Sequence, residues 1–65
     1  MAHTNHRIQV VGGRYDGYFW EVGVDGSAQW YDRTGLVIDH AVAAEIQVAY
    51  LLDSDGRAWR PKPVK

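Results

Sequence analysis

Glycine-ended turns recur along this chain and constrain its fold more than any other feature. The segments Tyr15-Asp16-Gly17, Val24-Asp25-Gly26 and Arg33-Thr34-Gly35 border stretches rich in aromatic and β-branched residues, which favour strands. A three-residue loop that ends in a left-handed glycine joins two antiparallel strands at low steric cost. The sequence therefore predicts a series of β-hairpins.

The second of these loops decides which side chains are buried. A two-residue turn would place Trp20 and Trp30 on opposite faces of the sheet, whereas a three-residue loop sets Trp20 opposite Trp30. The same loop sets Val22 opposite Ala28. Because a shift by one residue turns every side chain to the other face, burial of both tryptophans favours the three-residue loop.

The other two loops extend the same apolar face, with Gly12 leaving room for a tryptophan ring. Agreement between separate loops predicts a four-stranded antiparallel meander. The further pairs are Val10 with Val22, Gly12 with Trp20, and Trp30 with Ile38. The apolar face is predicted to hold Ile8, Val10, Trp20, Val22, Ala28, Trp30 and Ile38.

The segment 39–52 fits two structures. As a helix it begins at the N-cap Asp39, runs to Leu52, and covers the apolar face of the meander. As a strand, residues 46–52 alternate, and the turn Ser54-Asp55-Gly56 pairs Leu51 with Trp59. We favour an α+β fold, a four-stranded antiparallel β-meander packed against one C-terminal helix. The alternative is an all-β small SH3-like barrel with a short turn of helix at 39–44.

The length predicts a single small domain, 1–65, with a flexible N-terminus at 1–6 and a flexible C-terminal tail at 61–65. Prolines at 61 and 63 should end any strand pairing. A chain this short buries only about 60% of its unfolded surface. Since it has no cysteine, disulfides cannot stabilise it, and we expect a homodimer.

The charge balance excludes several classes of protein. Seven basic and eight acidic residues give a net charge of −1, which is unlike a dedicated duplex-DNA binder. No apolar run reaches the roughly 20 residues of a membrane span. We therefore expect a cytoplasmic protein with no membrane contact.

The polar residues form no recognisable catalytic or metal site. His3 and His6 lack further ligands, and the calcium-like start at Asp53-x-Asp55-Gly56 is followed by no other acid. The sequence thus predicts no enzyme, no metal and no cofactor. The enzymatic alternative is a site assembled across an oligomer interface, using Asp16, Glu21 or His40.

The outer side of the meander carries the strongest functional signal. Phe19 and Tyr31 point away from the tryptophans, with Glu21 and Arg33 beside them. Aromatic and arginine side chains together are typical of protein interfaces. We predict a partner-binding set of Phe19, Glu21, Tyr31, Arg33 and Trp59, in an accessory or inhibitory protein that acts on a larger protein partner. A phage or other mobile element could encode such a protein.

A nucleic-acid or nucleotide binder is the alternative function. Phe19, Tyr31 and Trp59 would then stack on bases while arginines contact phosphate. The basic residues available near the C-terminus for this role are Arg57, Arg60 and Lys62.

Overall fold

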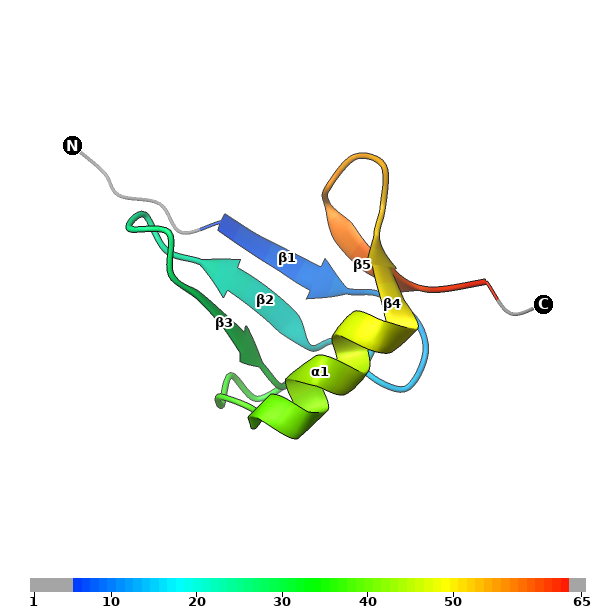
Figure 1. The fold of residues 1–65 in the computed structure, drawn as a ribbon, viewed down its shortest axis with the longest axis horizontal. Coiled ribbons are helices and arrows are strands. Elements are labelled where there is room, and N and C mark those ends of the chain that lie inside the picture. The colour runs from blue at the N-terminus through cyan, green and yellow to red at the C-terminus, as the bar shows by residue number, and fades with distance from the viewer. Residues whose placement is uncertain (1–5, 64–65) are drawn as a thin grey trace.

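The computed structural model describes residues 6–63, which form a five-stranded mixed sheet and one helix (Figure 1). The strand order is β3-β2-β1-β5-β4; β1 and β5 are parallel and all other neighbours are antiparallel. The predicted α+β class is confirmed. The elements are β1 (His6–Val10), β2 (Phe19–Val22), β3 (Ala28–Tyr31), α1 (His40–Ala49), β4 (Tyr50–Leu52) and β5 (Ala58–Pro61).

The predicted four-stranded antiparallel meander is wrong in its fourth strand. Residues 36–38 return beside β3 but form only one bridge, between Tyr31 and Val37. The predicted loop contacts are present, since the Asp32 N–H donates to the Leu36 carbonyl and the Ile38 N–H donates to the Trp30 carbonyl. The chain then leaves the sheet for α1, and the sheet gains β5 and β4 beyond β1 instead.

The β2–β3 hairpin has the predicted register, with Trp20 opposite Trp30 and Val22 opposite Ala28. The β1–β2 register differs by four residues, because Val22 lies opposite His6 instead of Val10. Because the register shifts by an even number of residues, every side chain of β1 stays on its predicted face of the sheet. Ile8 and Val10 therefore still lie on the same face as the tryptophans.

The β1–β2 connection explains this shift. Gly12 and Gly13 both have positive φ angles, +92° and +74°, which fold residues 11–17 into a wide loop instead of extending the strands. Tyr15, inside this loop, is buried in the core. Gly12 therefore does not make room for Trp20; a side chain there would meet Pro61.

The segment 39–52 combines parts of both predicted structures. Helix α1 begins as predicted, with Asp39 Oδ1 accepting from the Val42 N–H at 3.0 Å. It ends at Ala49, however, and Tyr50 is extended, so neither the helix to Leu52 nor the strand from residue 46 is correct. The sheet stays open, with β3 and β4 at its edges, so the barrel alternative is also wrong.

The last hairpin differs from the prediction by one residue. Leu52 lies opposite Trp59, where the sequence predicted Leu51, because the loop has an extra residue. Asp53 stabilises this longer loop by accepting from the Arg57 N–H at 3.0 Å. Two residues of the ends predicted to be flexible belong to the sheet: His6 begins β1, and Pro61 lies in β5 opposite Tyr50. Residues 1–5 and 64–65 lie outside the described part of the chain.

The core lies between α1 and one side of the sheet. Ile46 of α1 and Val10 of β1 are its most completely buried side chains. Trp30 packs beside them, whereas Ala28, predicted to be on the buried face, is exposed at the sheet edge. The buried cluster consists of Val10, Tyr15, Trp30, Ile46 and Tyr50.

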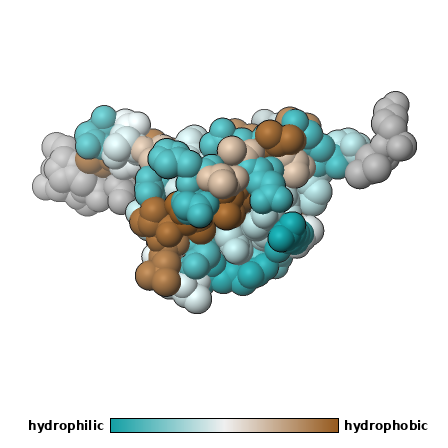
Figure 2. Space-filling view, turned by 60° about the horizontal axis from the view of Figure 1, so that its bottom comes forward, coloured by the Kyte–Doolittle hydropathy of each residue, from teal (hydrophilic) through white to brown (hydrophobic). Residues whose placement is uncertain are grey.

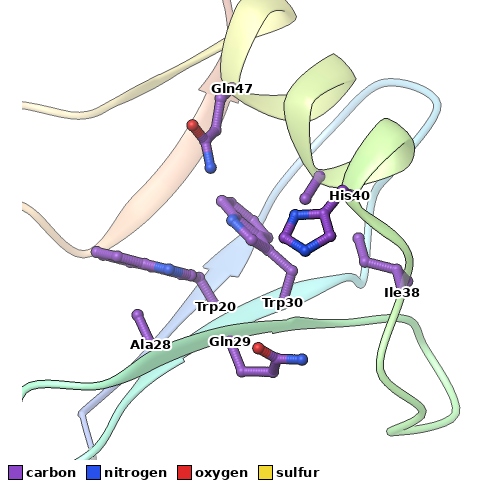
Figure 3. Close-up of a pocket in the computed structure, with 8 residues that line it drawn as sticks. Trp20, Ala28, Gln29, Trp30, Ile38, His40 and Gln47 are labelled. Carbon is purple, nitrogen blue, oxygen red and sulfur yellow. The ribbon is translucent and has the colours of Figure 1, made fainter.

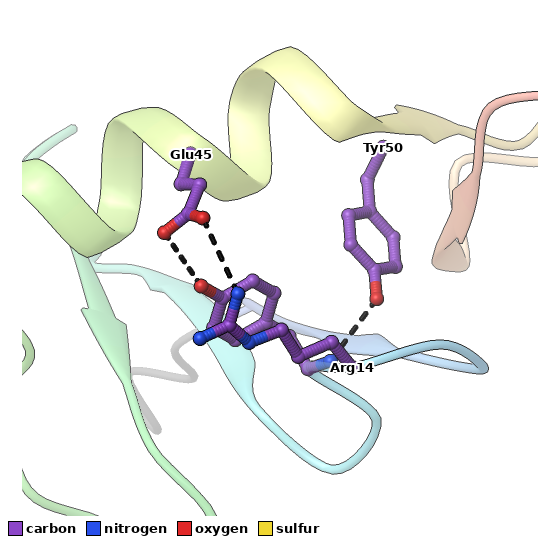
Figure 4. Close-up of polar contacts among 4 residues, drawn as sticks. Arg14, Glu45 and Tyr50 are labelled. Atoms are coloured by element: carbon purple, nitrogen blue, oxygen red, sulfur yellow. Dashed lines mark hydrogen bonds and ion pairs between the residues drawn. The ribbon is translucent and has the colours of Figure 1, made fainter.

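A polar network fastens the β1–β2 loop to α1 and β4 (Figure 4). The Tyr50 hydroxyl accepts from the Tyr15 N–H at 3.1 Å and donates to the Gly12 carbonyl at 2.9 Å. The Tyr15 hydroxyl donates to Glu45 Oε1 at 2.6 Å, and Arg14 lies 3.6 Å from the other Glu45 oxygen. The hydrogen bond to Glu45, followed by burial, raises the pKa of Tyr15 above its ordinary value.

Candidate partner-binding face

The side of β1–β3 away from α1 carries an ordered pair of aromatic rings. Because side chains alternate along a strand, Phe19 and Tyr31 point away from the core that buries Trp30. Their rings are stacked, with centroids 5.0 Å apart and planes 14° from parallel. They are also direct cross-strand partners, so two paired strands hold the rings in place.

Arg7 extends this pair on the β1 side. Its guanidinium carbon lies 4.3 Å from the centroid of the Phe19 ring, a cation–π contact. Its Nη2 lies 3.9 Å from Glu21 Oε1. The sequence prediction omitted Arg7, although alternation along β1 would have found it, because Ile8 and Val10 face inward.

Val37 extends the pair on the other side. It bridges Tyr31 directly, so the two side chains lie on the same side of the sheet, and Val37 is 57% exposed. We call Arg7, Phe19, Tyr31 and Val37 the outer row. Figure 2 shows hydrophobic atoms gathered on part of the surface among hydrophilic ones. The large apolar side chains that are exposed among the described residues are Val11, Val24, Leu36, Val37, Val48, Leu51 and Leu52.

Arg33, predicted to join the aromatic pair, instead holds two loops together. Its Nε donates to the Asp16 carbonyl at 2.6 Å, and its Nη2 donates to the Arg14 carbonyl at 3.0 Å. Its guanidinium carbon also lies 5.1 Å from the centroid of the Tyr18 ring. These contacts fix the β1–β2 loop against the turn after β3.

Trp59 lies on the opposite side of the sheet from the outer row. Its ring centroid is 5.8 Å from that of Trp20 and 5.4 Å from that of Trp30. Three tryptophans from three different strands thus pack together on the α1 side. The structure brings Phe19, Glu21 and Tyr31 together as predicted but leaves Trp59 out of that group.

The basic residues predicted for nucleic-acid contact lie on or beside β5, whereas the aromatic pair lies on β2 and β3. Arg60 lies on β5, which β1 separates from β2, and its Nε is 3.5 Å from Asp53 Oδ2. Arg57 belongs to the β4–β5 loop, and the Lys62 N–H donates to the Ala49 carbonyl. Because Trp59 faces α1, alternation along β5 turns Arg60 to the side of the outer row, with β1 between it and Phe19.

The acidic residues in the turns have structural hydrogen bonds. A Ser27 hydroxyl bond lowers the pKa of Asp25, and a Thr34 hydroxyl bond lowers the pKa of Asp32. The Arg57 backbone N–H lowers the pKa of Asp53 in the same way. Each of these carboxylates accepts hydrogen bonds from its own turn. Its lowered pKa is therefore explained by the turn itself and does not indicate a ligand-binding site.

The proposed enzymatic residues lie on three separate elements. Asp16 Oδ1 accepts from the Gly12 N–H at 2.7 Å within the first loop, Glu21 is on β2, and His40 begins α1. Within residues 6–63, no group of three or more histidine or acidic side chains could hold a metal ion. His3 lies outside those residues. No helix of the described chain is long and apolar enough to span a membrane.

Two cavities flank the edge strand β3. The helix-side cavity, about 350 Å³, lies between α1 and the β2–β3 hairpin (Figure 3). The outer cavity, about 190 Å³, lies on the side of the outer row. The helix-side cavity is lined by Trp20, Ala28, Gln29, Trp30, Ile38, His40, Ala43 and Gln47. The outer cavity is lined by Glu21, Gly23, Ser27, Ala28, Gln29 and Tyr31.

The comparisons with known proteins give this chain no family. No protein-family model, curated protein or solved structure matches it.

Proposed function

We propose that this chain is a small, non-catalytic protein-binding module whose outer row contacts a larger protein partner. The observation that carries this proposal is the stacked Phe19–Tyr31 pair with Arg7 over the Phe19 ring. Aromatic and arginine side chains are enriched among residues that dominate binding energy. Paired strands already order these side chains, so binding costs little additional side-chain entropy.

The position of the outer row supports the same proposal. Helix α1 and the buried cluster lie on the other side of the sheet, so the core does not require Phe19 and Tyr31 to be aromatic. Glu21 and Arg7 provide charges at the border of the row. An apolar centre with a charged rim is the usual anatomy of a protein interface.

The biological role proposed for this binding is accessory or inhibitory, in a cytoplasmic homodimer encoded by a phage or other mobile element. This proposal is supported by the small size of the chain and by Asp25, Asp32 and Asp53, whose carboxylates bond to groups of their own turns. Nucleic-acid binding is the alternative function, and the bonds of Arg33 to two loop carbonyls count equally against its contact with a protein or with phosphate. A nucleic-acid complex would weaken steeply as salt rises.

Replacing Phe19 and Tyr31 together tests the proposal. The variant Phe19→Thr/Tyr31→Thr keeps β-branched residues in both strands, so the sheet should still form. The immobilised wild-type and variant chains are exposed to lysate of the source cells, and captured proteins are quantified and retested as purified pairs. Binding should weaken at least about tenfold.

The matched control is Val48→Ala, which removes an exposed apolar side chain from α1. It should leave partner binding unchanged. Equal binding by the wild type and the double variant would refute the outer row as the contact surface.

A further inference from the structure

Among residues 6–63, the backbone N–H and C=O of Ala28 on the edge strand β3 have no hydrogen-bond partner. In an antiparallel pair, residues alternate between those bonded to the partner strand and those facing away from it. The Gly23 N–H donates to the Ser27 carbonyl, and the Trp30 carbonyl accepts from Ile38 on the opposite side. Ala28 lies two residues before Trp30 on the same strand, so the N–H and C=O of both residues point away from β2.

Only part of this edge is covered. The returning segment 36–38 pairs with β3 at Tyr31 and Trp30 and then turns into α1. Beside Ala28 no other segment of residues 6–63 pairs with this edge, and an open edge can accept another strand. Ala28 itself is exposed.

The two cavities lie on opposite sides of this open edge, and both are lined by Ala28 and Gln29. Successive side chains of an extended chain point to opposite sides of a sheet. A strand paired with Ala28 would therefore direct one side chain into the helix-side cavity and the next into the outer cavity. Peptide recognition at sheet edges uses this combination of backbone pairing and alternating side-chain pockets.

The lining of the helix-side cavity favours a bulky, uncharged side chain. Two tryptophan rings and Ile38 give it apolar walls, Gln29, His40 and Gln47 add polar groups at its border, and no aspartate, glutamate, lysine or arginine of the described residues lines it. Within residues 6–63, the buried Trp30 Nε1 has no hydrogen-bond partner. Figure 3 shows the Trp30 ring between Trp20 and His40, with Gln47 of α1 above it.

The lining of the outer cavity selects a polar side chain. Glu21, Ser27, Gln29 and Tyr31 surround it with carboxylate, hydroxyl and amide groups. The two cavities thus differ in chemistry as well as in side.

We propose that an extended peptide segment of a protein partner adds to β3 at Ala28. A large apolar residue of the peptide fills the helix-side cavity, and a neighbouring polar residue enters the outer cavity. The inference deepens the proposed function, on which it rests, because Tyr31 and Glu21 belong to both the outer cavity and the candidate partner-binding face.

A second copy of this chain fits the edge less well. Symmetric antiparallel pairing centred on Ala28 would bring Gly26 of one copy opposite Trp30 of the other. Glycine has no side chain to occupy the helix-side cavity. The apolar cavity therefore favours a partner segment with a bulky residue.

The experiment uses a random seven-residue peptide library displayed on phage, selected on the wild-type chain and counter-selected on Ala28→Pro. Proline removes the N–H that faces the open edge and leaves the β2–β3 hydrogen bonds, since edge strands tolerate it there. A second variant, Ala43→Leu, places extra side-chain volume in the helix-side cavity. Thermal melting checks that both variants fold.

The enriched peptides should share one bulky apolar residue next to a polar one. Their synthetic forms should bind wild type at least tenfold more tightly than either variant. N-methylation of the peptide amides that face β3 should abolish binding, which tests strand pairing without altering the protein. Binding should also shift the indole N–H resonance of Trp30.

The inference would be overturned if no peptide were enriched on the wild-type chain relative to Ala28→Pro. Peptide binding that survives both Ala43→Leu and N-methylation would overturn it as well. Self-association through the edge, with no peptide competing, would overturn it as well. Phe19 lines neither cavity, so Phe19→Thr separates this inference from the proposed function. If Phe19→Thr loses the protein partner while no peptide binds the wild type, the edge-strand inference is wrong and the proposed function stands. If peptides bind the wild type while the outer-row variants still bind the partner, the outer row is wrong as the contact surface and the edge-strand inference stands.

Discussion

Removing the hydroxyl of Tyr50 should destabilise this protein far more than the loss of one oxygen atom suggests. In Tyr50→Phe the buried Tyr15 N–H loses its acceptor, and the Gly12 carbonyl loses its donor. A buried group left unpaired costs about 1–3 kcal/mol, and a typical hydrogen bond contributes about 1 kcal/mol. We therefore expect unfolding free energy to fall by roughly 2–3 kcal/mol.

That loss corresponds to a decrease in Tm of roughly 10–20 °C for a domain of this size. Thermal and urea unfolding, followed by tryptophan fluorescence, would measure it. Tyr18→Phe is the matched control, because the Tyr18 hydroxyl has no hydrogen bond within residues 6–63, and its Tm should stay within a few degrees of wild type. Equal Tm values for Tyr50→Phe and wild type, or equal losses in both variants, would refute the role given to Tyr50.

Three further variants test other parts of the fold by urea or thermal unfolding. Asp39→Ala should lower stability by about 1 kcal/mol through loss of the N-cap bond, whereas Asp39→Asn should lose less than half as much; equal losses would contradict capping. Gly13→Ala should cost more than Gly35→Ala: both glycines have positive φ, but a Cβ at Gly13 would lie 2.5 Å from the Tyr50 hydroxyl and one at Gly35 would meet nothing. Hydrogen bonds lower the folded-state pKa of Asp32, so its contribution should be complete above about pH 4 and lost as the pH falls through that lowered value. Asp32→Asn should therefore flatten the acid limb of a stability–pH curve, and an unchanged limb would contradict this assignment.

The β2–β3 hairpin could be predicted because its evidence is local. One tight glycine-ended loop and the burial of two tryptophans were enough to fix the pairing of Trp20 with Trp30. The N-cap Asp39 was predictable for the same reason, since the bond to Val42 spans one turn.

The errors arose where contacts distant in sequence decide the local structure. The β1–β2 loop widens so that Tyr15 reaches Tyr50, 35 residues later, and no nearby residue indicates that contact. The end of α1 is similar, because Tyr50 leaves the helix to join the core and pair with Pro61.

The candidate site divides in the same way. Alternation along strands predicted that Phe19, Glu21 and Tyr31 share a face, and the same rule could have added Arg7. The long side chain of Arg33 binds carbonyls of another loop, and only the folded arrangement of the two loops reveals this.

Native mass spectrometry of the protein purified from its source cells tests the central claim most directly. We expect a complex with a polypeptide partner that persists at moderate salt and is lost in Phe19→Thr/Tyr31→Thr. A retained nucleotide or oligonucleotide mass, or a polypeptide complex unaffected by the double substitution, would contradict binding through the outer row.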